Sequence, residues 1–177
     1  MKKFKGLLLT LMLTGVLLLG ACTTTSDAPK KENYDEPSSS TQSESKEETF
    51  GLKETAVFDN LKVTVTEVKE SKGTDYFKPE KGNIFVGVNF TIENISDESE
   101  TISSLLMFEA YVDDVSADLS FTGACAFDNK SVDGDLAPGK KLVGWYVIET
   151  SKEWSEIEVI VKPDLLSDST ATFKYTK

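Results

Sequence analysis

Apolar and polar residues alternate in two stretches of the chain, which predicts two half-buried β-strands. Residues 61–68 read LKVTVTEV, with Leu61, Val63 and Val65 on one face. Residues 84–94 read IFVGVNFTIEN and repeat the pattern over a longer run. Alternation with a period of two is typical of a strand that packs one face against a core. In the longer strand we expect inward-pointing Val86, Val88, Phe90 and Ile92 and outward-pointing Asn89, Thr91 and Glu93.

Four more short β-rich runs follow, and turn signals separate the runs. The runs are residues 106–114, 140–149, 156–162 and 171–177. The turn signals are Lys72-Gly73, Lys81-Gly82-Asn83, Asp133-Gly134, Pro138-Gly139 and Pro163-Asp164. Short strands at this spacing predict an all-β fold, an antiparallel β-sandwich. The single helical segment expected after the N-terminal region is one turn at residues 103–106.

Two local features describe the strand at residues 140–149. Pro138 presets φ at the first central position of a turn and Gly139 allows the positive φ of the second, so the pair predicts a type II turn. Trp145 and Tyr146 are adjacent and must point to opposite faces of their strand. We expect one of them in the core. The pattern leaves open which one, because both faces of a central strand can be covered.

The first 22 residues combine a positive head, an apolar stretch and small residues. Lysines precede residues 7–19, a largely apolar run of 13 residues. This run is shorter than the roughly 20 residues of a permanent transmembrane helix, and its zones are those of a secretory signal. Residues 19–22 read LGAC and resemble a bacterial lipobox, which implies cleavage between Ala21 and Cys22 and attachment of diacylglycerol to the Cys22 thiol. The alternative is an ordinary signal peptide that contains a chance cysteine.

Lipidation would make Cys22 the first residue of the mature protein and its anchor, because two acyl chains hold a protein stably on a membrane. The next 26 residues are rich in Ser, Thr, Glu and Lys and contain no Val, Ile, Leu or Phe. Such a stretch cannot bury enough apolar surface to order itself, so we interpret it as a flexible stalk rather than a binding tail. The expected organisation is a signal peptide at 1–21, a lipidated cysteine and linker at 22–48, and a domain at 49–177.

The charge of the chain argues against nucleic acid as a partner. The full sequence carries a net charge of −11, and all of its basic residues are lysines. Loss of the three signal lysines leaves −14, of which about −10 belongs to residues 49–177. A surface this acidic repels phosphate backbones and anionic lipid headgroups.

The chain contains no His, which excludes Ser-His-Asp and Cys-His catalytic pairs and imidazole metal ligands. Once Cys22 is acylated, Cys125 is the one remaining cysteine, so no internal disulfide can form. Its apolar surroundings, FTGACAF, predict a small buried filler rather than a reactive thiol. We therefore expect no cofactor.

Acidic residues at predicted loops are the remaining candidates for chemistry. They are Asp113-Asp114 with Asp118, and Asp128 with Asp133 and Asp135. Calcium prefers six to eight oxygen ligands, and DNKSVDGD lacks the alternating acids and distal Glu of a calcium loop. We interpret these residues as solvated turn residues, with a weak calcium site at Asp128, Asp133 and Asp135 as the alternative. Paired carboxylates for glycoside cleavage also need a cleft, which a small sandwich seldom provides, so an enzyme is not expected.

Three blocks of sequence resemble a bacterial family of exported domains of unknown function. The blocks are DYFKPEKGNIFVGVNFTIEN (75–94), DGDLAPGKKLVGWYVIE (133–149) and VIVKP (159–163). Members of that family have an immunoglobulin-like fold and resemble the mycobacterial immunoprotective extracellular protein. The resemblance implies an immunoglobulin-like β-sandwich over residues 49–177 and an exported protein, and it supplies no catalytic or ligand-binding residues.

Two classes of function remain open. The first is a binding or adhesion-type module for an unknown protein or glycan ligand, held by Cys22 on the extracytoplasmic side of the cell membrane; it rests on analogy with the fold. The second is a structural or accessory subunit of an envelope protein complex, without catalysis. A contiguous exposed apolar patch would favour protein partners, and a concave aromatic pocket would favour a small ligand.

Overall fold

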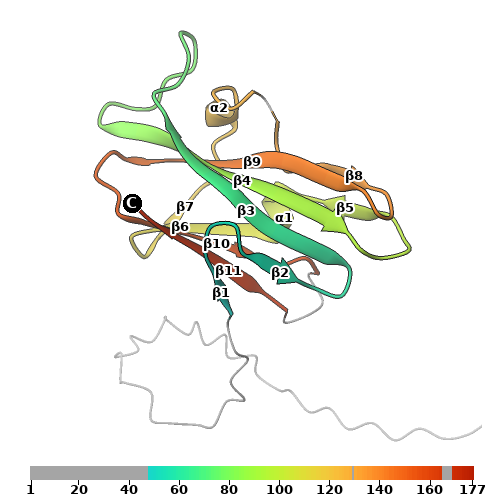
Figure 1. The fold of residues 1–177 in the computed structure, drawn as a ribbon. Coiled ribbons are helices and arrows are strands. Elements are labelled where there is room, and N and C mark those ends of the chain that lie inside the picture. Colours follow the sequence, from blue (N-terminus) through green and yellow to red (C-terminus); the bar gives the residue numbers. More distant parts are fainter. Residues whose placement is uncertain (1–47, 129, 165–168) are drawn as a thin grey trace, which may run out of the picture. The chain divides into compact units, whose positions relative to one another are not determined.

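Eleven strands and two one-turn helices make up the described part of the chain, residues 48–128, 130–164 and 169–177 of a computed structural model (Figure 1). The predicted signal peptide, with its cleavage point at Ala21 and Cys22, lies outside these residues. So does the predicted linker, apart from its last residue. Within the described residues, no helix has the length and apolar character needed to cross a membrane.

The elements follow one another in this order: β1 (Thr49–Phe50), β2 (Thr55–Val57), β3 (Leu61–Ser71), β4 (Asn83–Asn94), β5 (Glu100–Ile102), α1 (Ser104–Met107), β6 (Phe108–Val112), β7 (Val115–Ala117), α2 (Phe121–Ala124), β8 (Gly134–Leu136), β9 (Lys141–Ser151), β10 (Glu156–Val161) and β11 (Ala171–Thr176).

Two sheets face each other and confirm the predicted sandwich. One sheet has the strand order β2-β3-β4-β9, and the other has the order β1-β11-β10-β6-β7. A small two-stranded sheet of β5 and β8 lies beside them. The neighbouring strands are antiparallel, except that β1 runs parallel to β11.

The strand order is that of an immunoglobulin-like fold. We match β3, β4 and β9 to strands A, B and E of an immunoglobulin domain, and β6, β7, β10 and β11 to strands C, C′, F and G. With this matching, these strands have the same neighbours in both sheets as they have in an immunoglobulin domain. The chain passes from one sheet to the other between β1 and β2, between β4 and β6, between β7 and β9, and between β9 and β10. These crossings make the core depend on contacts between distant parts of the sequence.

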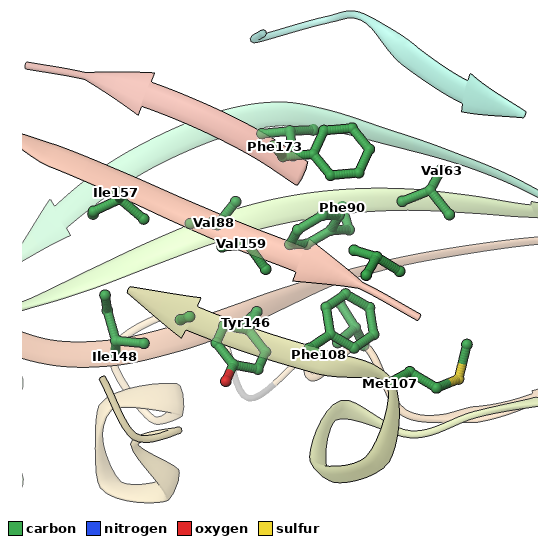
Figure 2. Packing of buried hydrophobic residues seen from close by; sticks show 14 of the residues in the cluster. Val63, Val88, Phe90, Met107, Phe108, Tyr146, Ile148, Ile157, Val159 and Phe173 are labelled. Carbon is green, nitrogen blue, oxygen red and sulfur yellow. The ribbon is translucent and has the colours of Figure 1, made fainter. Parts of the chain in front are cut away.

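The main core lies between the two sheets (Figure 2). Phe90 is fully buried, and its ring meets Phe108 and Phe173 edge to face, with centroids 5.2 and 5.8 Å away. The inward residues predicted for β3 and β4 are buried there, as expected: Leu61, Val63, Val65, Val86, Val88, Phe90 and Ile92. Full burial of one such side chain contributes about 1.5–3 kcal/mol to folding.

The opposite face of β4 is also covered, which the alternating pattern did not predict. Phe85 is fully buried on that face and packs with Val147 and Phe127 in a second apolar cluster. The cover comes from the segment after β7, which includes α2. Gly87 leaves room for it, since a Cβ at Gly87 would lie 2.7 Å from the Phe127 ring.

Asn89 corrects the sequence prediction at one position. It was expected to point outward into solvent, but it is buried on the covered face of β4. The Thr66 hydroxyl donates a 2.6 Å hydrogen bond to Asn89 Oδ1. Burial of this amide is tolerated because a partner satisfies its oxygen.

Trp145 and Tyr146 occupy opposite faces of β9, and both faces are covered. Tyr146 is buried in the main core, where its ring stacks on Phe108 with centroids 5.6 Å apart. Trp145 is half-buried and its ring lies 4.9 Å from Phe127 in the second cluster. Tyr146 is therefore the core aromatic.

The predicted turn and one-turn helix are present. Gly139 has a φ of 69°, and Lys140 N donates to Ala137 O at 3.1 Å, as a type II turn requires. Helix α1 lies at Ser104–Met107, one residue from its predicted position.

Helix α2 was not predicted from the sequence. Ser120 caps it, because Ser120 Oγ accepts a 3.1 Å hydrogen bond from Gly123 N. Cys125 follows directly and is half-buried, so it is less buried than the predicted buried filler.

Asn94 ends β4 and joins three segments. Its side chain is fully buried, and Nδ2 donates 2.7 Å hydrogen bonds to Glu98 O and Leu136 O. Its Oδ1 accepts from Ser96 N and Ser96 Oγ, both at 2.9 Å. The amide thus fixes the loop after β4 and ties it to β8.

Candidate functional site

A notch opens at one edge of the sandwich because β7 is shorter than β6. Strand β7 pairs only with Ala110–Val112, so Phe108 and Glu109 have no partner strand on that side. After β7 the chain leaves its sheet and reaches β9, where Leu119 bridges to Ile148. The notch lies between the start of β6 and this crossing segment.

The notch has a volume of about 360 Å³ and walls of mixed chemistry. Leu105, Phe108 and Leu119 supply apolar surface. The Glu109 and Asp118 carboxylates add negative charge. A neighbouring hollow of about 420 Å³ shares residues 116–119 and extends along β7 to the end of β9.

Tyr146 is the buried polar group of the notch. Its side chain lines the notch although the residue is only 3% exposed. Figure 2 shows the ring beside Phe108, with the hydroxyl oxygen on the side away from Phe90. Burial, together with the charges of Asp118 and Glu109, raises the pKa of Tyr146 to about 12. The phenol is therefore neutral near pH 7 and can both donate and accept a hydrogen bond.

The acidic residues singled out in the sequence are dispersed, and several have structural partners. Asp113 accepts hydrogen bonds from Ser155 N, Ser155 Oγ and Glu156 N. These bonds hold its pKa below the usual range, with the Ser155 hydroxyl bond as the largest cause. Asp114 is exposed on the same turn. Among these six residues, Asp118 alone lines the notch.

The three residues of the calcium alternative have different surroundings. Asp133 accepts from Ser104 N at 2.7 Å and from Ser104 Oγ at 3.0 Å. Asp135 accepts from Thr101 Oγ1 at 2.8 Å, and Asp128 is exposed. Across the described ranges, no three His, Cys, Asp or Glu residues lie close enough together to hold a metal ion.

Glu70, Trp154 and Lys177 form a second group of charged and aromatic residues, and their contacts with one another stabilise the fold. Glu70 Oε1 accepts from Trp154 Nε1 at 2.8 Å and from Lys177 Nζ at 2.6 Å. The Lys177 bond is the largest cause that lowers the pKa of Glu70. Lys177 Nζ also lies 4.9 Å from the centre of the Trp154 ring. This cluster fastens the C-terminal end to β3.

The sequence pattern points to Tyr146 and Asp118 separately and does not predict that they lie close together. It leaves open whether Tyr146 or Trp145 is in the core, and it groups Asp118 with Asp113 and Asp114. Leu105 and Glu109 were not singled out at all. Their proximity depends on where β7 stops, which no local sequence signal gives.

Solved structures with similar folds come from bacteria. The ycdA protein of Bacillus subtilis, a candidate lipoprotein, has a TM-score of 0.58 and 17% identity, over 69% of this chain and 38% of its own. The yjhA protein of B. subtilis has a TM-score of 0.56 and 18% identity, over 71% and 98%. An uncharacterised β-sandwich protein of Clostridium difficile has a TM-score of 0.52 and 14% identity, over 78% and 100%.

These likenesses establish the fold alone, because the identities are low. The chain spans little more than a third of the ycdA chain. A search of curated proteins gave no match. The family described as Domain of unknown function (DUF4352) matches residues 50–172, which is more than half of the sequence, and the chain therefore belongs to this family.

Proposed function

We propose that the protein is a lipid-anchored, extracytoplasmic binding module without catalytic activity. Diacylglycerol on Cys22 holds it on the membrane, residues 23–48 form a stalk, and the immunoglobulin-like domain binds a ligand. The observation that carries the anchor is the sequence LGAC at the end of a 13-residue apolar run. The similarity to ycdA, a candidate lipoprotein, supports it.

The binding role is supported by the notch at the edge of the sandwich. It combines apolar walls with the Tyr146 side chain and nearby carboxylates, which is the usual composition of a ligand site.

A non-catalytic role is supported by the hydrogen bonds of the acidic side chains, because these bonds connect segments of the fold. Asp113, Asp133 and Asp135 hold backbone or hydroxyl groups of other segments. The sequence also provides no His as a general base. We therefore assign the domain to recognition rather than to hydrolysis.

An accessory subunit of an envelope complex is the second candidate. Leu105 and Leu106 of α1 are 67% and 62% exposed, and Phe121 of α2 is 68% exposed. Exposed apolar side chains of this size favour contact with another protein.

The anchor is tested by exchange of the signal. Residues 1–21 are replaced by a conventional secretory signal, and Cys22→Ser removes the thiol. We expect this protein in the medium and the natural chain in the membrane fraction. The mature polypeptide carries a net charge of −14, so an anionic leaflet repels it.

The single change Cys22→Ser is the weaker test, because an uncut precursor could stay in the membrane through its own apolar run. Retention of the signal-exchanged protein in the envelope would contradict the lipid as the sole anchor. It would show instead that a protein or wall component holds the domain.

A further inference from the structure

The Tyr146 side chain is almost fully buried, and its hydroxyl has no hydrogen-bond partner within the described residues. Tyr146 is 97% buried, since its exposed fraction is 3%. Among the described residues, Thr172 Oγ1 is the buried side-chain oxygen that lacks a partner, so the Tyr146 hydroxyl keeps contact with solvent. Because Tyr146 lines the notch, a ligand that enters the notch can replace water at this hydroxyl.

The carboxylates near the Tyr146 hydroxyl favour a ligand with a positive charge. Glu109 is already paired, since Lys162 Nζ lies 2.7 Å from its Oε1. Asp118 is exposed and makes no hydrogen bond or ion pair with any part of the chain that the structure describes. The negative charge of residues 49–177, about −10, adds a field that attracts cations and repels anions.

The apolar walls of the notch favour a ligand that carries its positive charge on an apolar chain. Leu105, Phe108 and Leu119 line the same notch as Tyr146 and Asp118. Leu105 is 67% exposed, so a ligand could cover apolar surface there that water now contacts. A compact metal ion would gain nothing from these walls and would find too few oxygen ligands.

From this arrangement we propose that the notch between β6, β7 and β9 binds a primary ammonium group on an apolar stem. The ammonium donates hydrogen bonds to Tyr146 Oη and to the Asp118 carboxylate, and the stem packs against Leu105 and Leu119. This chemistry occurs in free alkylamines and in lysine side chains of exposed peptides. The proposal rests on the binding role proposed above and names its ligand class.

The test is a titration of the mature chain, residues 22–177 with Cys22→Ser, followed by two-dimensional NMR of the backbone amides. The probes are pentylammonium, Nα-acetyl-lysine N-methylamide and the uncharged control 1-pentanol. We expect saturable shifts with both amines, confined to residues around the notch, and much weaker shifts with pentanol.

Two variants connect the binding to the named groups. Tyr146→Phe removes only the hydroxyl, and Asp118→Asn removes the charge. Each should weaken amine binding by about tenfold, the loss expected for one hydrogen bond to a charged group. Asp114→Asn is the matched control, because Asp114 is an exposed carboxylate on the β6–β7 turn outside the notch, and it should leave binding unchanged.

Tighter binding of the lysine derivative than of pentylammonium would identify a peptide as the source, and equal binding would identify a free amine. Pentanol binding as tight as that of the amines would overturn the proposal, as would amine binding unaffected by Tyr146→Phe and Asp118→Asn. If Tyr146→Phe does not fold, Asp118→Asn decides, since that residue is exposed. Failure here leaves the lipid anchor untouched, because the signal exchange measures the anchor without any ligand.

Discussion

Val88→Asp should remove a large part of the stability of the protein. Val88 is 3% exposed in the middle of β4, where Val68 and Tyr146 lie beside it on the neighbouring strands. The substitution buries a carboxylate without a partner, and we expect a loss of roughly 4 kcal/mol or more in the free energy of unfolding. That loss is comparable with the whole stability of many domains of this size. Urea unfolding of the mature chain, followed by circular dichroism, measures it.

Val143→Asp is the matched control for this prediction. Val143 lies on β9 of the same sheet, but it is 55% exposed. The same change in chemistry there should cost less than about 1 kcal/mol, because the new charge stays in water. Equal losses for the two variants would show that the inward face of β4 is wrongly assigned.

Asn94→Ala should cost roughly 3 kcal/mol. The change removes the donors for Glu98 O and Leu136 O and the acceptor for Ser96 N, all in a fully buried place. Polar groups that lose their hydrogen-bond partners at a buried place still carry the full free-energy cost of leaving water. Thermal and urea unfolding of the variant give the loss directly.

Two further variants separate hydrogen bonding from volume. Asn94→Asp keeps the size and the acceptor but turns the two donors into a group that repels carbonyl oxygens, so it should be at least as damaging. Asn83→Ala removes one 3.0 Å bond to Glu149 at a half-buried place and should cost under about 1 kcal/mol. A stable Asn94→Asp protein would contradict the donor role of this amide.

The strands could be predicted from the sequence because their inner faces are set by local alternation. Leu61, Val63 and Val65 face the core as the period of two requires. The turn at Gly139 could also be predicted, since its positive φ is a local requirement.

The covered outer face of β4 could not be predicted in the same way. Phe85 and Asn89 are buried there because the segment around Phe127 folds over them. That cover comes from about forty residues further along the chain, and alternation within β4 carries no information about it. The unexpected α2 belongs to the same covering segment.

The candidate site could not be predicted either, because it depends on contacts between residues that are distant in the sequence. The partners of Asp133 and Asp113 lie 29 and 42 residues away, so their structural roles were not visible in the local sequence. The notch exists because β7 ends at Ala117 while β6 begins earlier along the same edge. Its hydroxyl comes from β9, which belongs to the other sheet.

The proposed anchor and the proposed binding role both agree with the acidity of the domain. An anionic leaflet repels the negative charge of residues 49–177, so the proposed lipid on Cys22 would be needed to hold the domain at a membrane. The same acidity would attract the cationic ligand proposed for the notch.

Mass spectrometry of the protein's N-terminal peptide, isolated from its native membrane, tests the anchor most directly. We expect a mature chain that begins at Cys22, with diacylglycerol on the cysteine sulfur and residues 1–21 absent. A mature protein that begins elsewhere, or one that carries Cys22 as an unmodified thiol, would contradict the lipid anchor.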